Sequence, residues 1–99
     1  MQSTLSGSSI VVAAKDHVSC DLAGEAVILG VKSGIYYGLN AVGARIWNLI
    51  QEPKLVDAIC KTILEEYDVE AERGERDILA LLEDLLTNGL VEIRHETAS

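Results

Sequence analysis

Short apolar runs rich in Val and Ile predict strands in the N-terminal part of the chain. Each run is too short for a typical helix, and the runs are Ile10–Ala14, His17–Leu22, Glu25–Val31 and Ile35–Leu39. Gly34 stands in the connection between the last two, where glycine can adopt the positive φ of a tight turn. The last two runs therefore predict a β-hairpin.

From Asn40 onward the apolar positions follow helical spacing. Asn40 is a good N-cap for a first helix, which Glu52-Pro53 ends. The second helix has the cleanest amphipathic stripe in the chain, formed by Val56, Ile59, Cys60, Ile63, Leu64 and Tyr67. Ala71–Asn88 predicts a third helix with a wide apolar face, and Gly89 suits the left-handed position after it. Leu90–Ile93 predicts a final short strand.

This order of elements predicts an α+β domain. Two helices joined by a short turn and flanked by a hairpin are typical of a winged helix-turn-helix. We expect an N-terminal three-stranded antiparallel sheet followed by three helices. The length of 99 residues suffices for one core. The expected limits are a flexible tail over residues 1–9, a domain over 10–94 and a C-terminal tail over 95–99.

Composition and charge exclude several classes of function. The hydrophobic share is 48%, which predicts a folded chain. Eight basic against 16 acidic residues give a net charge of −8, which disfavours binding to nucleic acid or anionic lipid. No apolar run approaches the roughly 20 residues that cross a bilayer. The first nine residues lack the basic and apolar segments of a signal peptide. We therefore expect a cytoplasmic protein that binds neither nucleic acid nor membrane.

Candidates for catalysis and metal binding are few. His17 and Cys20 are close in sequence, but their odd separation puts them on opposite faces of a strand. A surface histidine and a buried cysteine are therefore favoured over a catalytic pair. A tetrahedral metal site is disfavoured because His95 lies in the tail and Cys60 on the core stripe. Reduced thiols are favoured over a disulfide. We expect no enzymatic reaction, no metal and no cofactor.

A helix-turn-helix could instead bind DNA through its last helix, Ala71–Asn88. That helix carries Arg73 and Arg76, but its acidic residues outnumber them: Glu72, Glu75, Asp77, Glu83 and Asp84. Such a helix would meet phosphate with net repulsion. A winged-helix regulator that binds DNA or a protein is therefore kept as the alternative from another functional class.

The strand Ile35–Leu39 is the most informative candidate for binding. It is apolar and aromatic, and no Lys or Pro within it protects it from pairing with another chain. At the edge of a sheet its free N–H and C=O groups would form a template for an extended peptide. The alternative, equally favoured by this feature alone, is an ordinary strand with Tyr36 on one face and Tyr37 on the other.

The third helix could form the second wall of such a site. On a helical wheel Asp77, Leu81 and Asp84 lie along one flank, with Arg73 and Ala80 close by. Leu81 and Ala80 could contact an apolar anchor, and the charged residues could orient the ligand. For each charged residue taken singly, a solvated helix face remains the favoured interpretation.

Several blocks of the chain together resemble the PqqD-like family of peptide-recognition domains, and most of all its small stand-alone members in lasso peptide gene clusters. The resemblance spans about Ile10–Ile93. Its blocks are Ala26–Leu29, Gly34–Asn40, Gly43–Ile50, Ile59-Cys60, Tyr67–Val69, Asp77–Leu79, Leu85-Leu86 and Gly89–Val91. The order of these blocks, the small size and the acidic balance agree with one another.

The resemblance implies a non-catalytic protein that binds the N-terminal leader of a precursor peptide. In such families the leader adds as a strand beside the third strand, here Ile35–Leu39, and faces the third helix, here Ala71–Asn88. It also implies delivery of the precursor to a separate cysteine-type leader peptidase and a macrocyclising enzyme. The expected peptide-binding residues are Ile35, Tyr36, Tyr37, Gly38, Leu39, Arg73, Arg76, Asp77, Ala80, Leu81 and Asp84.

Overall fold

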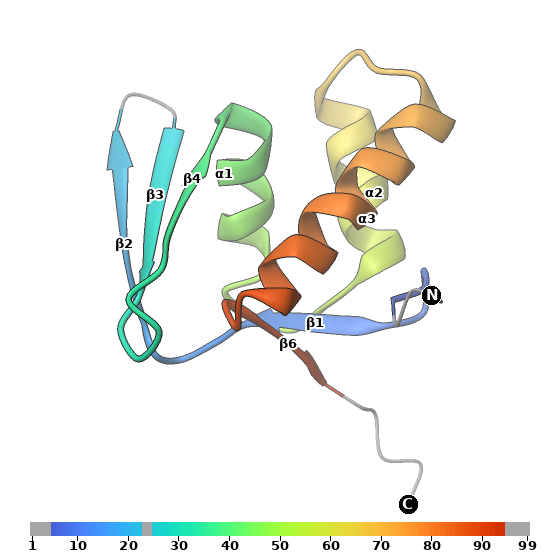
Figure 1. Cartoon of the computed structure of the whole chain (residues 1–99). Coiled ribbons are helices and arrows are strands. Elements are labelled where there is room, and N and C mark those ends of the chain that lie inside the picture. The colour runs from blue at the N-terminus through green and yellow to red at the C-terminus, as the bar shows by residue number, and fades with distance from the viewer. Residues whose placement is uncertain (1–4, 23–24, 95–99) are drawn as a thin grey trace, which may run out of the picture.

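The computed structural model describes residues 5–22 and 25–94 and has the predicted α+β class (Figure 1). Ala23-Gly24, between the second and third predicted strands, and the tail over 95–99 lie outside the described residues, as do residues 1–4 of the other expected tail. In chain order the elements are β1 (Ile10–Ala13), β2 (His17–Leu22), β3 (Glu25–Gly30), β4 (Tyr36–Leu39), α1 (Ala41–Leu49), β5 (Lys54–Leu55), α2 (Val56–Glu66), α3 (Ala71–Thr87) and β6 (Val91–Arg94).

The described strands form two three-stranded antiparallel sheets. One has the order β2-β3-β4 and is the predicted N-terminal sheet. The other has the order β5-β1-β6, so the first predicted strand belongs to a different sheet from the three that follow it. In that second sheet Val11 faces Ile93 from the end of the chain, and Ile10 faces Leu55. The sequence did not predict β5, because two residues carry no periodicity.

Local signals placed the start of α1 and the bounds of α3 correctly, but α1 ends at Leu49, before the Glu52-Pro53 that was expected to stop it. Asn40 is the N-cap of α1, and its side chain accepts the N–H of Gly43 at 2.9 Å. Gly34 and Gly89 have φ of 71° and 76°, the left-handed values that only glycine adopts readily. α2 and α3 are consecutive helices joined by residues 67–70, an arrangement compatible with a winged helix-turn-helix, and that label stays a prediction.

Residues 5–9 pack against the start of α2. Leu5 is buried in the core. α2 has no side-chain cap, and its first N–H groups are satisfied by this segment instead. The N–H of Val56 donates to the Ser9 carbonyl at 2.9 Å, and that of Asp57 to the Gly7 carbonyl at 3.0 Å. This part of the expected tail therefore has defined contacts.

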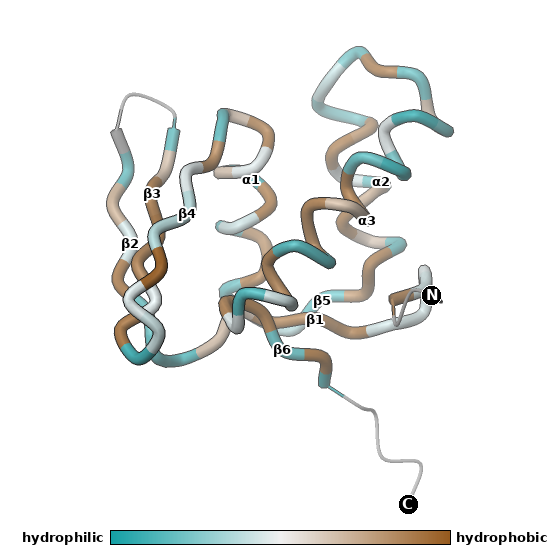
Figure 2. Tube along the Cα trace, in the orientation of Figure 1, coloured by the Kyte–Doolittle hydropathy of each residue, from teal (hydrophilic) through white to brown (hydrophobic). Residues whose placement is uncertain are grey.

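A single apolar core joins the two sheets and the helices. α1 packs on β3 and on α2, and α3 packs on α2 and β6. Hydrophobic residues follow β1 and β3 and recur along each helix (Figure 2). The largest fully buried side chains are Ile28, Ile46, Ile50, Ile59, Ile63, Leu82, Leu85, Leu90, Val11 and Val56. None of the described helices combines the length and apolar character needed to cross a membrane.

Candidate peptide-binding groove

β4 is an edge strand, because it pairs with β3 on one side only. Residues of an antiparallel strand direct their backbone groups alternately toward one neighbour and the other. The N–H of Gly30 donates to the Ile35 carbonyl at 3.0 Å. Ile35, and Tyr37 two residues later, therefore direct their backbone N–H and C=O groups toward β3. Tyr36 and Gly38 therefore direct their N–H and C=O groups toward the free edge, where an extended peptide could pair.

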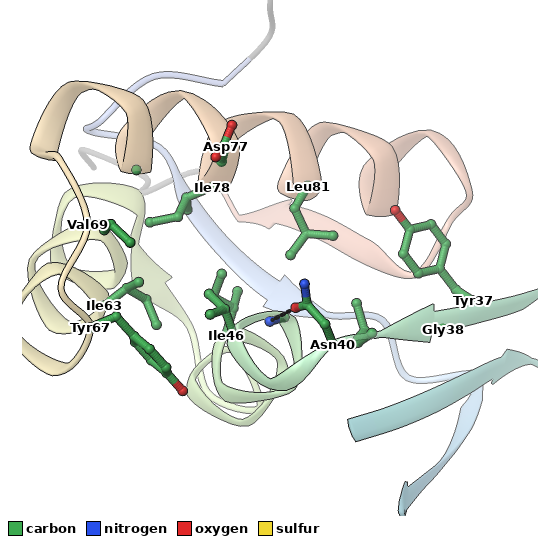
Figure 3. A pocket seen from close by; sticks show the side chains of 14 residues that line it. Tyr37, Gly38, Asn40, Ile46, Ile63, Tyr67, Val69, Asp77, Ile78 and Leu81 are labelled. Carbon is green, nitrogen blue, oxygen red and sulfur yellow. Dashed lines mark hydrogen bonds between the residues drawn. The ribbon is translucent and has the colours of Figure 1, made fainter. Parts of the chain in front are cut away.

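The free edge of β4 borders a cavity of about 340 Å³ that extends to α3, and we call this cavity the groove (Figure 3). Its lining is largely apolar and comes from four parts of the chain. These are Tyr37, Gly38 and Leu39 of β4; Asn40, Val42, Gly43 and Ile46 at α1; Ile63, Tyr67 and Val69 at the end of α2; and Gly74, Asp77, Ile78 and Leu81 of α3. The groove is thus a space between an open strand edge and three helices.

A second, more polar cavity adjoins the groove where α2 passes into α3. It is lined by Asp68, Val69, Glu70, Arg73, Gly74 and Asp77. Val69, Gly74 and Asp77 line both cavities, so the groove and this polar cavity share part of their walls. Three carboxylates against one guanidinium make the polar cavity acidic.

Tyr37 and Asp84 link β4 to α3. The Tyr37 hydroxyl donates to Oδ2 of Asp84 at 3.1 Å. In Figure 3 the Tyr37 ring reaches toward α3 at the end of the groove remote from Val69. The pKa of Tyr37 is raised above the 10.0 of an ordinary tyrosine, mainly because the side chain is partly buried. The hydrogen bond to Asp84 and the negative charge of that carboxylate raise it further.

This shift predicts a loss of stability in alkaline solution. The pKa of Tyr37 is higher in the folded than in the unfolded chain, so above pH 10.0 the folded chain holds more protons. The contribution of Tyr37 to the free energy of unfolding is therefore complete below pH 10.0. It is lost as the pH rises through the pKa of Tyr37 in the folded chain. Urea unfolding of the wild type and of Tyr37→Phe at neutral and alkaline pH tests this, and the variant should lose less stability. A parallel loss in both proteins would contradict it.

The stretch of chain that contains this groove matches a known family. Residues 25–91 match the family described as coenzyme PQQ synthesis protein D (PqqD). The chain belongs to the PqqD family. Among proteins with curated functions, none matches it.

Three solved structures resemble this PqqD-family chain. TbiB1 in complex with the TbiA(beta) leader peptide is 35% identical, with a TM-score of 0.76, over 86% of this chain and 99% of that one. A lasso peptide synthetase B1 complexed with the leader peptide is 27% identical, with a TM-score of 0.72, over 83% and 96%. The PqqD truncation of Methylobacterium extorquens PqqCD, described as a functional, stand-alone RiPP recognition element, shares the fold at 20% identity, with a TM-score of 0.74, over 91% and 96%.

The structure brings together many of the residues singled out in the sequence of this PqqD-family chain. The groove is lined by Tyr37, Gly38, Leu39, Asp77 and Leu81. Arg73 lines the adjoining polar cavity, and Asp84 holds the Tyr37 hydroxyl. The helical wheel placed this flank of α3 correctly, because one helix face is fixed by sequence spacing alone.

Other predicted residues lie outside the groove. Ile35 precedes β4, and its carbonyl is bonded to β3. Tyr36 is 73% exposed. It lies on the opposite face of the sheet from Tyr37, as expected for neighbouring residues of a strand. Arg76 and Ala80 are exposed on α3 and line neither of the two cavities.

The sequence pattern does not indicate the walls that α1 and α2 supply. It identifies Asn40 only as a helix cap, and Tyr67 only as part of an apolar stripe. The available signal was glycine inside predicted helices, where it is costly without a packing reason. A Cβ on Gly43 would lie 3.1 Å from Cδ2 of Leu39, and one on Gly74 would lie 2.8 Å from Cδ2 of Leu64. Both glycines permit close approach, and both line the groove.

Gly74→Val is expected to destabilise the fold by about 1–3 kcal/mol. Although glycine is a poor helix former, the new side chain would overlap Leu64, and Cγ2 of Val69 is also only 3.1 Å from its Cβ. Ala80→Val is the matched control, because Ala80 is exposed on the same helix. Urea unfolding measures both variants, and equal midpoints would show that close packing at Gly74 is not required.

The cysteines and histidine weighed for catalysis do not form a cluster. The His17 ring meets Trp47 edge-on, with 4.9 Å between ring centroids, and Nδ1 is bonded to the Ala14 carbonyl. Cys20 is exposed, so the expectation that it is buried was wrong, because nothing covers that face of β2 in the described structure. Cys60 is buried as predicted, and burial raises the pKa of its thiol; both thiols are free. No group of three metal-ligating side chains occurs within residues 5–22 and 25–94.

Proposed function

We propose that this chain is a non-catalytic adaptor that binds the leader of a ribosomally made precursor, and that the product is a lasso peptide. The observation that carries the proposal is the free edge of β4 opening on an apolar groove whose far wall is α3. The leader would add as a strand to β4 and bond to the backbone of Tyr36 and Gly38. Two solved relatives of the same fold hold leader peptides, which supports this assignment.

Side-chain anchors must supply much of the affinity. Micromolar binding corresponds to about 8 kcal/mol. Backbone hydrogen bonds contribute about 0.5–1.5 kcal/mol each, which is too little against the cost of ordering a flexible peptide. One or two apolar side chains of the leader, at about 1.5–3 kcal/mol each, would therefore enter the groove beside Leu81 and Ile78. Asp77 and Arg73 would orient the peptide, and the adjoining acidic cavity suits a leader that carries Lys or Arg.

The adaptor would act by raising effective concentration. Capture of the leader makes the encounter between the scissile bond and a separate cysteine-type leader peptidase nearly intramolecular, and a macrocyclising enzyme would act next. The free thiols of Cys20 and Cys60 suit the reducing cytoplasm, where we place this step.

An amide-shift NMR titration tests the proposal. The probes are a synthetic leader peptide, taken from a precursor reading frame sought beside the gene, and, as a control, a duplex DNA. We expect the leader to shift signals of Ile35–Leu39, of the start of α1 and of the groove-facing flank of α3, and the DNA to shift none. The absence of any response to the leader would overturn the proposal. A salt-sensitive response to DNA would instead favour the regulator.

Backbone N-methylation of the leader tests the mode of binding. In strand addition only every second N–H of the peptide faces β4, so methylation should weaken binding at alternate positions. The unmethylated leader and the methylated positions in between are matched controls. Uniform tolerance of methylation along the peptide would contradict strand addition.

A further inference from the structure

Asn40 lies where the free edge of β4 passes into α1, and the oxygen of its side-chain amide is already hydrogen-bonded. Oδ1 accepts the N–H of Gly43 as the helix cap. That bond fixes the orientation of the amide, and in Figure 3 the nitrogen, Nδ2, points across the groove toward Leu81 on α3. Within the described part of the chain Nδ2 has no hydrogen-bond partner. Asn40 is exposed, and it lines the groove.

The backbone of Asn40 continues the alternation of β4. Its φ of −75° and ψ of −175° are extended, and it follows Gly38 by two residues. Its N–H is therefore directed to the same free edge as the backbone groups of Tyr36 and Gly38. Its carbonyl turns away, because it accepts the N–H of Ala44 at 2.8 Å. Asn40 thus offers two donor atoms, its backbone nitrogen and Nδ2, at the place where the strand edge ends, and both of its oxygens already accept a hydrogen bond.

We propose that Asn40 binds the peptide backbone: its backbone N–H and Nδ2 donate to carbonyl oxygens of the leader just beyond Gly38. This inference rests on the proposed function and adds a residue to that site. The contact prolongs strand pairing past the last residue of β4 without requiring a particular side chain in the ligand. Asn40 would therefore contribute to affinity for the extended backbone, while Leu81 and the apolar walls select side chains.

Two substitutions separate capping from binding. Serine and aspartate cap helices as well as asparagine does, since each presents an oxygen to the N–H of Gly43. Neither retains the Nδ2 donor. We expect Asn40→Ser to leave the urea midpoint unchanged and to weaken leader binding about threefold to tenfold. Asn40→Asp should weaken it about tenfold or more, because a carboxylate would face a carbonyl oxygen.

Asn48→Asp is the control for added charge, because Asn48 is exposed on α1 and does not line the groove. It should bind the leader as the wild type does. A second readout is the side-chain amide signal of Asn40, identified by its loss in Asn40→Ser. We expect this signal to shift when the leader is added.

The outcomes distinguish two failures. If the wild type binds the leader but Asn40→Ser and Asn40→Asp bind equally well, the assignment of Asn40 is overturned and the proposed function stands. A wild type that does not bind the leader would overturn the proposed function, and the role of Asn40 with it.

Discussion

Gly38→Pro is expected to weaken leader binding at least about tenfold and to leave the chain folded. The N–H of Gly38 faces the free edge of β4, so its loss removes no bond to β3. Proline is tolerated on edge strands for this reason. Its ring would lie where the carbonyl of an added strand must approach. Anisotropy of a fluorescently labelled leader measures the affinity, and circular dichroism checks the fold.

Gly38→Ala is the matched control. It keeps the N–H, and its Cβ would meet no heavy atom within 4 Å. We expect this variant to bind as the wild type does. If the proline variant also bound normally, strand addition to β4 would be wrong, whatever the role of the groove.

Leu81→Ala is expected to lower the affinity for the leader about tenfold to a hundredfold. Leu81 projects from α3 into the groove opposite β4 and is half-buried before any ligand is present (Figure 3). Truncation would remove contact with an anchor side chain, worth about 1.5–3 kcal/mol. The labelled-leader assay measures this loss.

Two further variants control for the Leu81 result. Leu79→Ala truncates a partly buried leucine of α3 that packs on the core and does not line the groove, so it should lower stability without lowering affinity. Glu83→Ala removes a charge from the same helix and should cost less affinity than Leu81→Ala, because Glu83 lines neither of the two cavities. Equal losses for Leu81→Ala and Glu83→Ala would count against the groove as the binding site.

Two of the four parts of the chain that line the groove, β4 and α3, followed from periodicity. The alternation of a strand over Ile35–Leu39 and the helical wheel of α3 each indicate which residues share one face. Four of these residues line the groove in the structure: Tyr37, Leu39, Asp77 and Leu81. The role of Asn40 as a cap was also local, because capping involves residues three apart. That its Nδ2 points across a groove depends on the position of α3, which the local sequence does not determine.

The sequence by itself determined the class of the fold, the helix caps, the glycine turns and the flank of α3 that faces the groove. These depend on interactions between residues close in sequence, which the pattern of residue types records directly. Tertiary structure alone decided that β1 pairs with β6, that Cys20 is exposed, and that α1 and α2 complete the groove. Those outcomes depend on contacts between segments far apart in the chain. Many arrangements of the same elements satisfy the local pattern, and only the packing of one shared core selects among them.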